Sequence, residues 1–350
     1  MMTNQRQSLL RRIFAKQEAG IIAATALLIA GLSLVNPAFI SRANILSLMI
    51  TFSFIGIIAV GEAMMIMAGD FDISVGSVAG MGAVISTTFM LRTNCFGLLE
   101  TGGEWIGVLL CVIIAVLLCG LVGLLNAFLV VKVRLAPFLV TIATYFIARS
   151  IANVIAKGVP VYPLPKTVDW LGDLRLSIGG WNTGISWIFI FFLVLTVIFE
   201  FILRKTEFGR AIYATGSNKV VAQLSGINTD KIRFFCFIIT SMFAGLSGFM
   251  TAAYMRMGYS MTGNMWELMV IASVVVGGVS VAGGKGSMIG MFAGVVLIHV
   301  LSTGLVMLGM NTYLSYVFQG AMNVAAVFFD QLLRAREIKG ASTGPSFEQA

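Results

Sequence analysis

The chain has 350 residues, of which 58% are apolar and only 11% are charged. Soluble domains carry about 25% charged residues, so this composition excludes an ordinary soluble fold. Long uncharged stretches and 38 glycines are typical of lipid-facing helices that pack closely on small residues. The formal charge of +8 does not indicate a nucleic-acid partner, because the basic residues of membrane proteins collect in cytoplasmic loops. We therefore expect an all-α, polytopic membrane protein.

About 20 apolar residues cross a bilayer as a helix, and ten stretches of the chain approach that length. In chain order they are Ala19–Val35, Leu46–Ala68, Ile73–Leu91, Trp105–Val131, Pro137–Ile155, Ile185–Leu203, Ile232–Tyr254, Trp266–Ala282, Met288–Leu308 and Tyr313–Leu333. With the N-terminus in the cytoplasm, ten spans place most Lys and Arg residues on the cytoplasmic side. This predicts a cytoplasmic arm (1–18), a transmembrane domain (19–333), a cytoplasmic tail (334–350) and both termini inside.

Two long segments connect the expected spans. The outside segment 156–184 contains three prolines and a Gly-Gly pair, which predicts a loop with little helix. The cytoplasmic segment 204–231 contains a Gly-Ser-Asn turn followed by a short apolar run. Ser217 or Asn218 can cap a helix there, and Gly226 suits the left-handed position after it.

The predicted helix in segment 204–231 has about two turns. Its apolar side consists of Val220, Val221 and Leu224. An isolated helix this short is marginal in water, so it needs a surface to dock on. That surface is either the anionic headgroups of the membrane or a groove on a soluble partner.

The segment "TEFGRAIYATGSNKVVAQLSGINTDKIR" resembles the coupling segment of permease subunits in bacterial ATP-binding-cassette (ABC) importers for monosaccharides, the ribose-like group. Three further segments match that family in the same order: "AGDFDISVGSVAG", "TIATYFIARSIANVIAKGVPV" and "ASVVVGGVSVAGGKGSMIG". The resemblance implies a multi-pass protein of the bacterial cytoplasmic (inner) membrane. It also implies some broken helices and a translocation pathway for a sugar or sugar-like solute.

The resemblance further implies several partners. These are cytoplasmic ATPase subunits, a periplasmic binding protein and a second permease copy or paralogue, with lipid around the spans. ATP and magnesium would be held by the ATPase, so we expect no cofactor and no metal on this chain. The residues expected to couple to the ATPase are Gly209, Arg210, Gly216, Ser217, Asn218, Val220, Val221, Ala222, Leu224, Ser225 and Gly226.

Two aspartates, Asp70 and Asp72, lie in the short connection between the second and third stretches. Asp72 or Ser74 can cap the following helix, and Gly76 allows close packing. A helix that starts inside the membrane can also present its N–H groups and a carboxylate to a polyhydroxylated substrate. Asp70 replaces a glycine that is usual in the family. If the two carboxylates are close, their double ionisation is disfavoured.

Four other polar residues are candidates for the substrate pathway. A charge within a span costs about 2.5–3.5 kcal/mol on insertion scales, so Glu62 and Arg149 should face the interior or reach an interface. Snorkelling to the outer surface is the alternative for Arg149. Glu267 resembles a family glutamate at the outer start of the eighth stretch. Asn126 can bind sugar hydroxyls, although contacts between helices are the commoner use of such residues.

Two glycine-rich runs, Gly69–Gly76 and Gly277–Gly286, interrupt apolar stretches in the two halves of the chain. In transporters, paired interruptions of this kind indicate the central pathway. The second run does not satisfy the phosphate-loop pattern GxxxxGK[ST], so the chain has no ATP site of that kind. We therefore expect a transport subunit and not an enzyme. The alternative is an ion-coupled secondary transporter in which Glu62, Asp70 or Asp72 binds the coupling ion.

Overall fold

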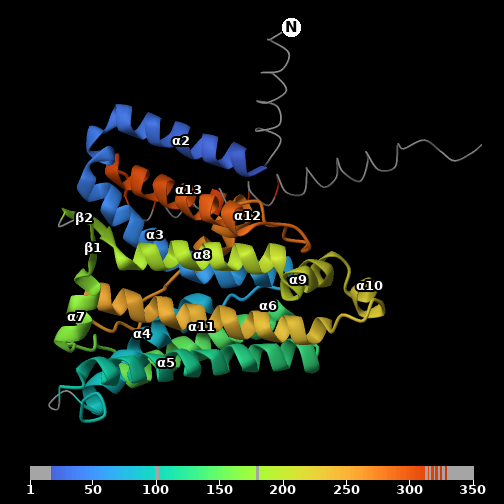
Figure 1. Cartoon of the computed structure of the whole chain (residues 1–350), viewed down its shortest axis with the longest axis horizontal. Helices are drawn as coiled ribbons and strands as arrows, with labels where there is room; N and C mark the ends of the chain where they lie inside the picture. Colours follow the sequence, from blue (N-terminus) through green and yellow to red (C-terminus); the bar gives the residue numbers. More distant parts are fainter. Residues whose placement is uncertain are drawn as a thin grey trace, which may run out of the picture.

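The computed structural model describes residues 17–98, 102–178 and 181–311, together with isolated positions between 314 and 328. Most of its helices run along one common direction and form a single bundle (Figure 1). The helices are α2 (Gln17–Val35), η1 (Pro37–Ile40), α3 (Arg42–Met67), α4 (Val75–Arg92), α5 (Glu104–Ala127), η2 (Phe128–Lys132), α6 (Pro137–Ala156), α7 (Lys166–Asp173), α8 (Trp187–Lys205), α9 (Glu207–Ser217), α10 (Lys219–Leu224), α11 (Thr229–Met255), α12 (Trp266–Val276) and α13 (Met288–Met307). The strands β1 (Arg175–Ile178) and β2 (Trp181–Ser186) form one antiparallel hairpin.

Seven helices in the described ranges are long and apolar enough to cross a membrane: α3, α4, α5 with η2, α6, α8, α11 and α13. A polytopic helical membrane protein is therefore confirmed. The count of ten spans and the cytoplasmic position of both termini stay predictions. The tenth stretch, Tyr313–Leu333, and the tail 334–350 lie outside the continuously described ranges, as does most of the arm 1–18.

The eighth expected span, Trp266–Ala282, is wrong as a continuous helix. Its helical part, α12, has 11 residues and is about 16 Å long, roughly half of a bilayer core. The preceding segment 256–265 has no regular structure and runs along α4, because Gly258 lies against Thr87 and Gly263 lies against Gly76. The expected span therefore stops being helical after Val276, where the run Gly277–Gly286 begins, and the irregular segment 256–265 lies before its helical part.

Helix α11 forms the centre of the bundle and packs against α3, α4 and α5. Small residues allow this close packing. A Cβ atom on Gly82 of α4 would lie 2.5 Å from the carbonyl oxygen of Gly245 in α11, which no side chain tolerates. Helix α5, by contrast, exposes Leu117 and Leu121 on its outer side, as expected of a helix in contact with lipid.

The two ends of the bundle differ (Figure 1). One end carries α9 and α10, and we call it the α10 end; the other carries α7 and the hairpin, and we call it the α7 end. The prediction of little helix in segment 156–184 is wrong, because α7 forms there. Pro163 and Pro165 precede this helix and do not interrupt it, while Thr167 donates its N–H to Oε1 of Glu104 at 2.9 Å. Val168 is fully buried, so α7 is folded onto the bundle.

Candidate functional site

Helix α10 begins and ends as its sequence predicts. The Asn218 side chain accepts hydrogen bonds from the N–H groups of Val220 and Val221, both at 3.1 Å, so Asn218 is the cap. Gly226 adopts the left-handed conformation, with φ at +84°. The helix has six residues, or about 1.7 turns at 3.6 residues per turn, close to the two turns expected. Ser217 does not cap it, because Ser217 ends α9.

Helix α9 is an element that the sequence analysis missed. Thr206 caps it by accepting the N–H of Gly209 at 3.2 Å, and Glu207 lies in its first turn. A threonine followed by an acidic residue is a helix-start signal, and it could have revealed α9. Four expected coupling residues lie in this helix instead of in a loop: Gly209, Arg210, Gly216 and Ser217.

One face of α10 is apolar and exposed. Val220, Val221 and Leu224 are 65%, 56% and 83% exposed. We call these three residues the α10 face. Ala222 is only 4% exposed, so the expectation that it also faces a partner is wrong. The chain turns back after α10, and the N–H of Ile227 donates to the carbonyl oxygen of Ala222 at 3.0 Å, which places Ala222 on the inner side.

Helix α9 packs against both glycine-rich runs. A Cβ atom on Gly216 would collide with the carbonyl oxygen of Met67, the last residue of α3. The same oxygen accepts the N–H of Gly284 at 2.9 Å. The Tyr213 hydroxyl donates to the carbonyl oxygen of Gly286 at 2.8 Å. The second glycine-rich run and the end of α3, just before the first run, therefore meet beneath α9.

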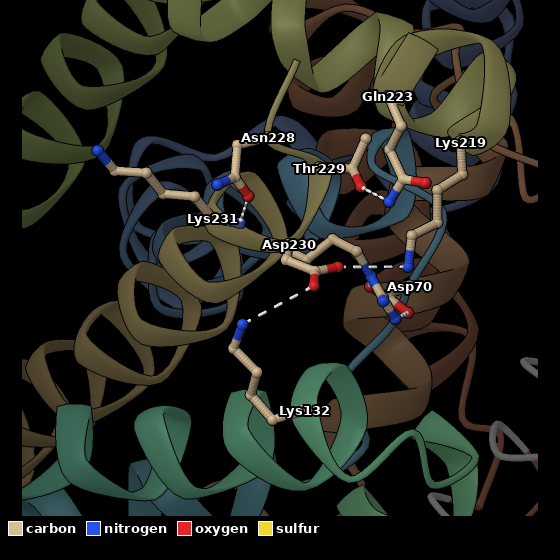
Figure 2. Close-up of polar contacts among 9 residues, drawn as sticks. Asp70, Lys132, Lys219, Gln223, Asn228, Thr229, Asp230 and Lys231 are labelled. Atoms are coloured by element: carbon tan, nitrogen blue, oxygen red, sulfur yellow. Dashed lines mark hydrogen bonds and ion pairs between the residues drawn. The ribbon is translucent and has the colours of Figure 1, made fainter. Parts of the chain in front are cut away.

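Polar side chains fasten α10 to the start of α11 (Figure 2). Nε2 of Gln223 donates to Oγ1 of Thr229 at 2.9 Å. Asp230 forms ion pairs with two lysines: Nζ of Lys219 lies 3.5 Å from its Oδ1, and Nζ of Lys132 lies 4.0 Å from its Oδ2. These ion pairs are one-third to two-thirds exposed, so each contributes about 0–1 kcal/mol. The hydrogen bond between Gln223 and Thr229 is partly buried, because Thr229 is buried while Gln223 is exposed.

A buried polar group surrounds the connection between α3 and α4. Oδ1 of Asp72 accepts hydrogen bonds from the N–H and the hydroxyl of Ser74, at 2.8 and 2.6 Å. Oε1 of Glu62 accepts the N–H of Asp72 at 2.9 Å. Nδ2 of Asn126 donates to Oδ2 of Asp72 at 3.3 Å and to the Ser74 hydroxyl at 3.2 Å. All four residues are 0% exposed, which confirms that Glu62 faces the interior.

The expected cap at this position is wrong in detail. Ser74 is the residue before α4, but its side chain makes no capping bond. Asp72 instead closes a turn ahead of the helix through the two bonds from Ser74. Asp70 and Asp72 also have separate partners and do not form a pair with each other. Asp70 forms a bidentate ion pair with Arg233. Nε of Arg233 donates to Oδ2 of Asp70 at 2.5 Å, and Nη2 donates to Oδ1 at 2.8 Å.

Arg149 and Glu267 lie in a second buried group, closer to the α7 end. Nη1 of Arg149 donates to the carbonyl oxygens of Ser260 and of Thr262, the latter at 2.8 Å. The Arg149 side chain is thus held inside the bundle and does not snorkel. A Cβ atom on Gly76 would collide with Oε2 of Glu267, so this glycine lets the start of α12 approach α4. Within the described ranges, Nε and Nη2 of Arg149 and Oε2 of Glu267 have no hydrogen-bond partner.

Comparison with known proteins shows to which family the chain belongs. A sequence profile described as the permease component of branched-chain amino acid transport systems matches residues 44–327. The chain belongs to this permease family. No solved structure matches the permease.

The permease is also similar to individual sugar permeases over nearly its whole length. It is 32% identical to an L-arabinose ABC transporter permease protein of Azospirillum brasilense, over 90% of this chain and 88% of the relative. It is 32% identical to a ribose import permease protein of Haemophilus influenzae, over 97% and 100%. It is 28% identical to a galactose/methyl galactoside import permease protein of Escherichia coli, over 92% and 96%.

These matches support the transport-subunit interpretation of the permease. The permease is a multi-pass subunit of an ABC importer in the bacterial cytoplasmic membrane. It is a transport component, as the matching family and relatives are. The alternative of an ion-coupled secondary transporter is wrong, because the matching proteins are ABC permeases.

Arg233 is the functional candidate that the sequence analysis missed in the permease. It lies 163 residues from Asp70, and no local pattern connects positions so far apart. One signal was available. Asp70 stands where the resembling family usually has glycine, and a new buried carboxylate requires a basic partner.

Proposed function

We propose that the permease forms the pathway for a sugar or sugar-like solute, delivered by a periplasmic binding protein and driven by a separate ATPase. Relatives named for L-arabinose, ribose and galactose support the substrate class. The exposed α10 face carries the coupling part of the proposal. Its three large apolar side chains lie at the tip of an element that is fastened to the bundle on its other side. An apolar helix face of this kind is suited to a groove on a partner protein.

The docked partner is the ATPase, which holds ATP and magnesium, and two permease copies or paralogues complete the pore. Segment 204–231, with α9 and α10, is the coupling element on the cytoplasmic side. Gly209, Arg210, Gly216, Ser217, Asn218, Ser225 and Gly226 shape and orient it, while the α10 face makes the contact. The exposed apolar sides of the outer helices contact lipid.

The substrate pathway uses the two buried polar groups. Oε2 of Glu62, Oδ1 of Asn126, Oε2 of Glu267 and two nitrogens of Arg149 are buried without hydrogen-bond partners among the described residues. Sugar hydroxyls can both donate and accept, so they can satisfy carboxylate, amide and guanidinium groups together. We assign the remaining pathway candidates, Asp70, Asp72, Ser74 and Gly76, to holding these groups in place.

The test is transport into proteoliposomes that contain the permease, its ATPase and its binding protein. Labelled L-arabinose, ribose and galactose serve as probes, and labelled leucine is the control for the amino acid class. ATP-dependent uptake of at least one sugar, unaffected by collapse of the membrane potential, is the expected result. Uptake of leucine alone would overturn the substrate class, and uptake that follows the membrane potential without ATP would overturn the mechanism.

A further inference from the structure

We propose that Arg233 is a positioning residue that transmits movement of the coupling helix α10 to the connection between α3 and α4, through its ion pair with Asp70. The inference rests on the proposed docking of α10 on the ATPase. It adds to that function a specific route, from the docking surface to the buried polar group around Asp72.

The route begins where α10 is attached to α11. Gln223 of α10 donates to the Thr229 hydroxyl at 2.9 Å, and Thr229 is 1% exposed. The carbonyl oxygen of Ala222 accepts the N–H of Ile227 at 3.0 Å, just before α11 begins. A displacement of α10 therefore pulls on the first turn of α11.

The route continues along one side of α11. Thr229 and Arg233 are four residues apart, so they lie one above the other on the same helix face. Arg233 reaches from that face to Asp70 and makes two nitrogen-to-oxygen contacts, at 2.5 and 2.8 Å. A bidentate ion pair fixes the relative orientation of the two side chains as well as the distance between them, whereas a single contact does not fix the orientation.

The ion pair between Asp70 and Arg233 is more deeply buried than the other ion pairs at the α10 end. The side chains of Asp70 and Arg233 are 2% and 12% exposed. Those of Lys219 and Asp230 are 44% and 34% exposed, and Lys132 is 60% exposed. Water and salt weaken the exposed pairs, whereas the buried pair cannot be broken without leaving an uncompensated charge. Asp70 and Arg233 are thus the firm link in this cluster.

The route ends at the buried polar group. Asp70 is two residues before Asp72, whose N–H is bound by Glu62 and whose carboxylate holds Ser74 at the start of α4. A shift of Asp70 must move this short connection, since α3 ends at Met67 and α4 begins at Val75. Coupling between two sites is reciprocal, so a change of conformation in the buried polar group would also reach α10 through the ion pair between Asp70 and Arg233.

The test is the rate of backbone amide hydrogen exchange in segment 67–74. It is measured on the full permease in lipid nanodiscs, first without its ATPase and then with the ATPase bound to a non-hydrolysable ATP analogue. In the wild type, docking should change the exchange rate of this segment by about fivefold or more, the lower limit of ordinary allosteric coupling. The double variant Asp70→Asn/Arg233→Gln removes both charges and leaves no lone buried charge. It should retain the ATPase but lose most of that response. Asp230→Asn is the matched control, and its response should stay.

Each other outcome overturns the proposal. An unchanged response in the double variant, with normal ATPase retention, would reject the route alone. Failure of the double variant to fold or to retain the ATPase would make the pair a structural contact only. Loss of the response in Asp230→Asn to the same degree would assign the route to the exposed pairs. Failure of the wild-type permease to retain its ATPase would reject the proposed function itself, and with it this inference.

Discussion

The backbone N–H of Asp72 donates a hydrogen bond to Oε1 of Glu62 at 2.9 Å, inside the bundle and away from water. A carboxylate from α3 therefore satisfies a backbone donor in the connection that leads into α4. Glu62 has a structural role at Oε1, whereas its Oε2 has no hydrogen-bond partner among the residues that the structure describes and is the atom that we assign to the proposed pathway.

Substitution of Glu62 should separate these two roles. Glu62→Gln keeps an oxygen acceptor for the Asp72 N–H, so its thermal stability in detergent should stay close to that of the wild type. Glu62→Leu leaves this buried donor unsatisfied and should destabilise the protein by about 1–3 kcal/mol. Thermal unfolding of both purified variants is the measurement. Equal stability of the Leu and Gln variants would contradict the structural role.

Gly76 should not tolerate even one methyl group. A Cβ atom there would collide with Oε2 of Glu267 and with the carbonyl oxygen of Gly263, so Gly76→Ala should cost about 1–3 kcal/mol through overpacking. Gly20→Ala in α2 is the matched control, because nothing lies within 4 Å of its added methyl group. Both substitutions improve helix propensity equally. If the two variants show the same folded yield and unfolding temperature, the close approach of α12 to α4 is wrong.

Ala222→Glu should disrupt the coupling element itself. Ala222 is buried beneath α10, and a carboxylate there must either lose its water or push the helix outward. We expect faster proteolysis within segment 204–231 while the spans still insert normally. The measurement is limited proteolysis of the purified variant beside Ser225→Ala, an exposed control on the same element. Equal cleavage rates would show that Ala222 tolerates a charge and faces outward.

The two ends of the bundle should lie on opposite sides of the membrane. The four native cysteines are buried, so a cysteine introduced at an exposed position reports its own accessibility. Ser225→Cys at the α10 end should react with an impermeant maleimide only from the cytoplasm. Leu176→Cys in β1, at the α7 end, should react only from the periplasm. Labelling of both from one side would overturn the predicted topology.

The sequence predicts the long spans well because each is a continuous apolar run of sufficient length. The expected stretch Pro137–Ile155, for example, differs from α6 by one residue. It predicts α9 and α7 poorly, because both are short and polar and become helical by packing on the bundle. The early end of α12 at Val276 was also missed, since residues 277–282 continue the uncharged, largely apolar sequence without continuing the helix.

Within the candidate site, local features were predictable and distant ones were not. The cap at Asn218 and the left-handed Gly226 depend on neighbouring residues alone, and both are confirmed. The inward direction of Ala222 depends on how the chain returns after α10. The pairing of Asp70 with Arg233 depends on two helices meeting, and spacing along the chain carries no information about it.

The docking of the α10 face is tested most directly by co-purification of the ATPase with variants of that face. Val221→Glu and Leu224→Glu place a charge on side chains that are 56% and 83% exposed, so neither should disturb the folded permease. We expect normal insertion and stability, about 100-fold weaker retention of the ATPase, which corresponds to about 2.7 kcal/mol, and loss of ATP hydrolysis stimulated by the loaded binding protein. Full retention of the ATPase and unchanged stimulation in both variants would contradict the assignment of α10 as the coupling helix.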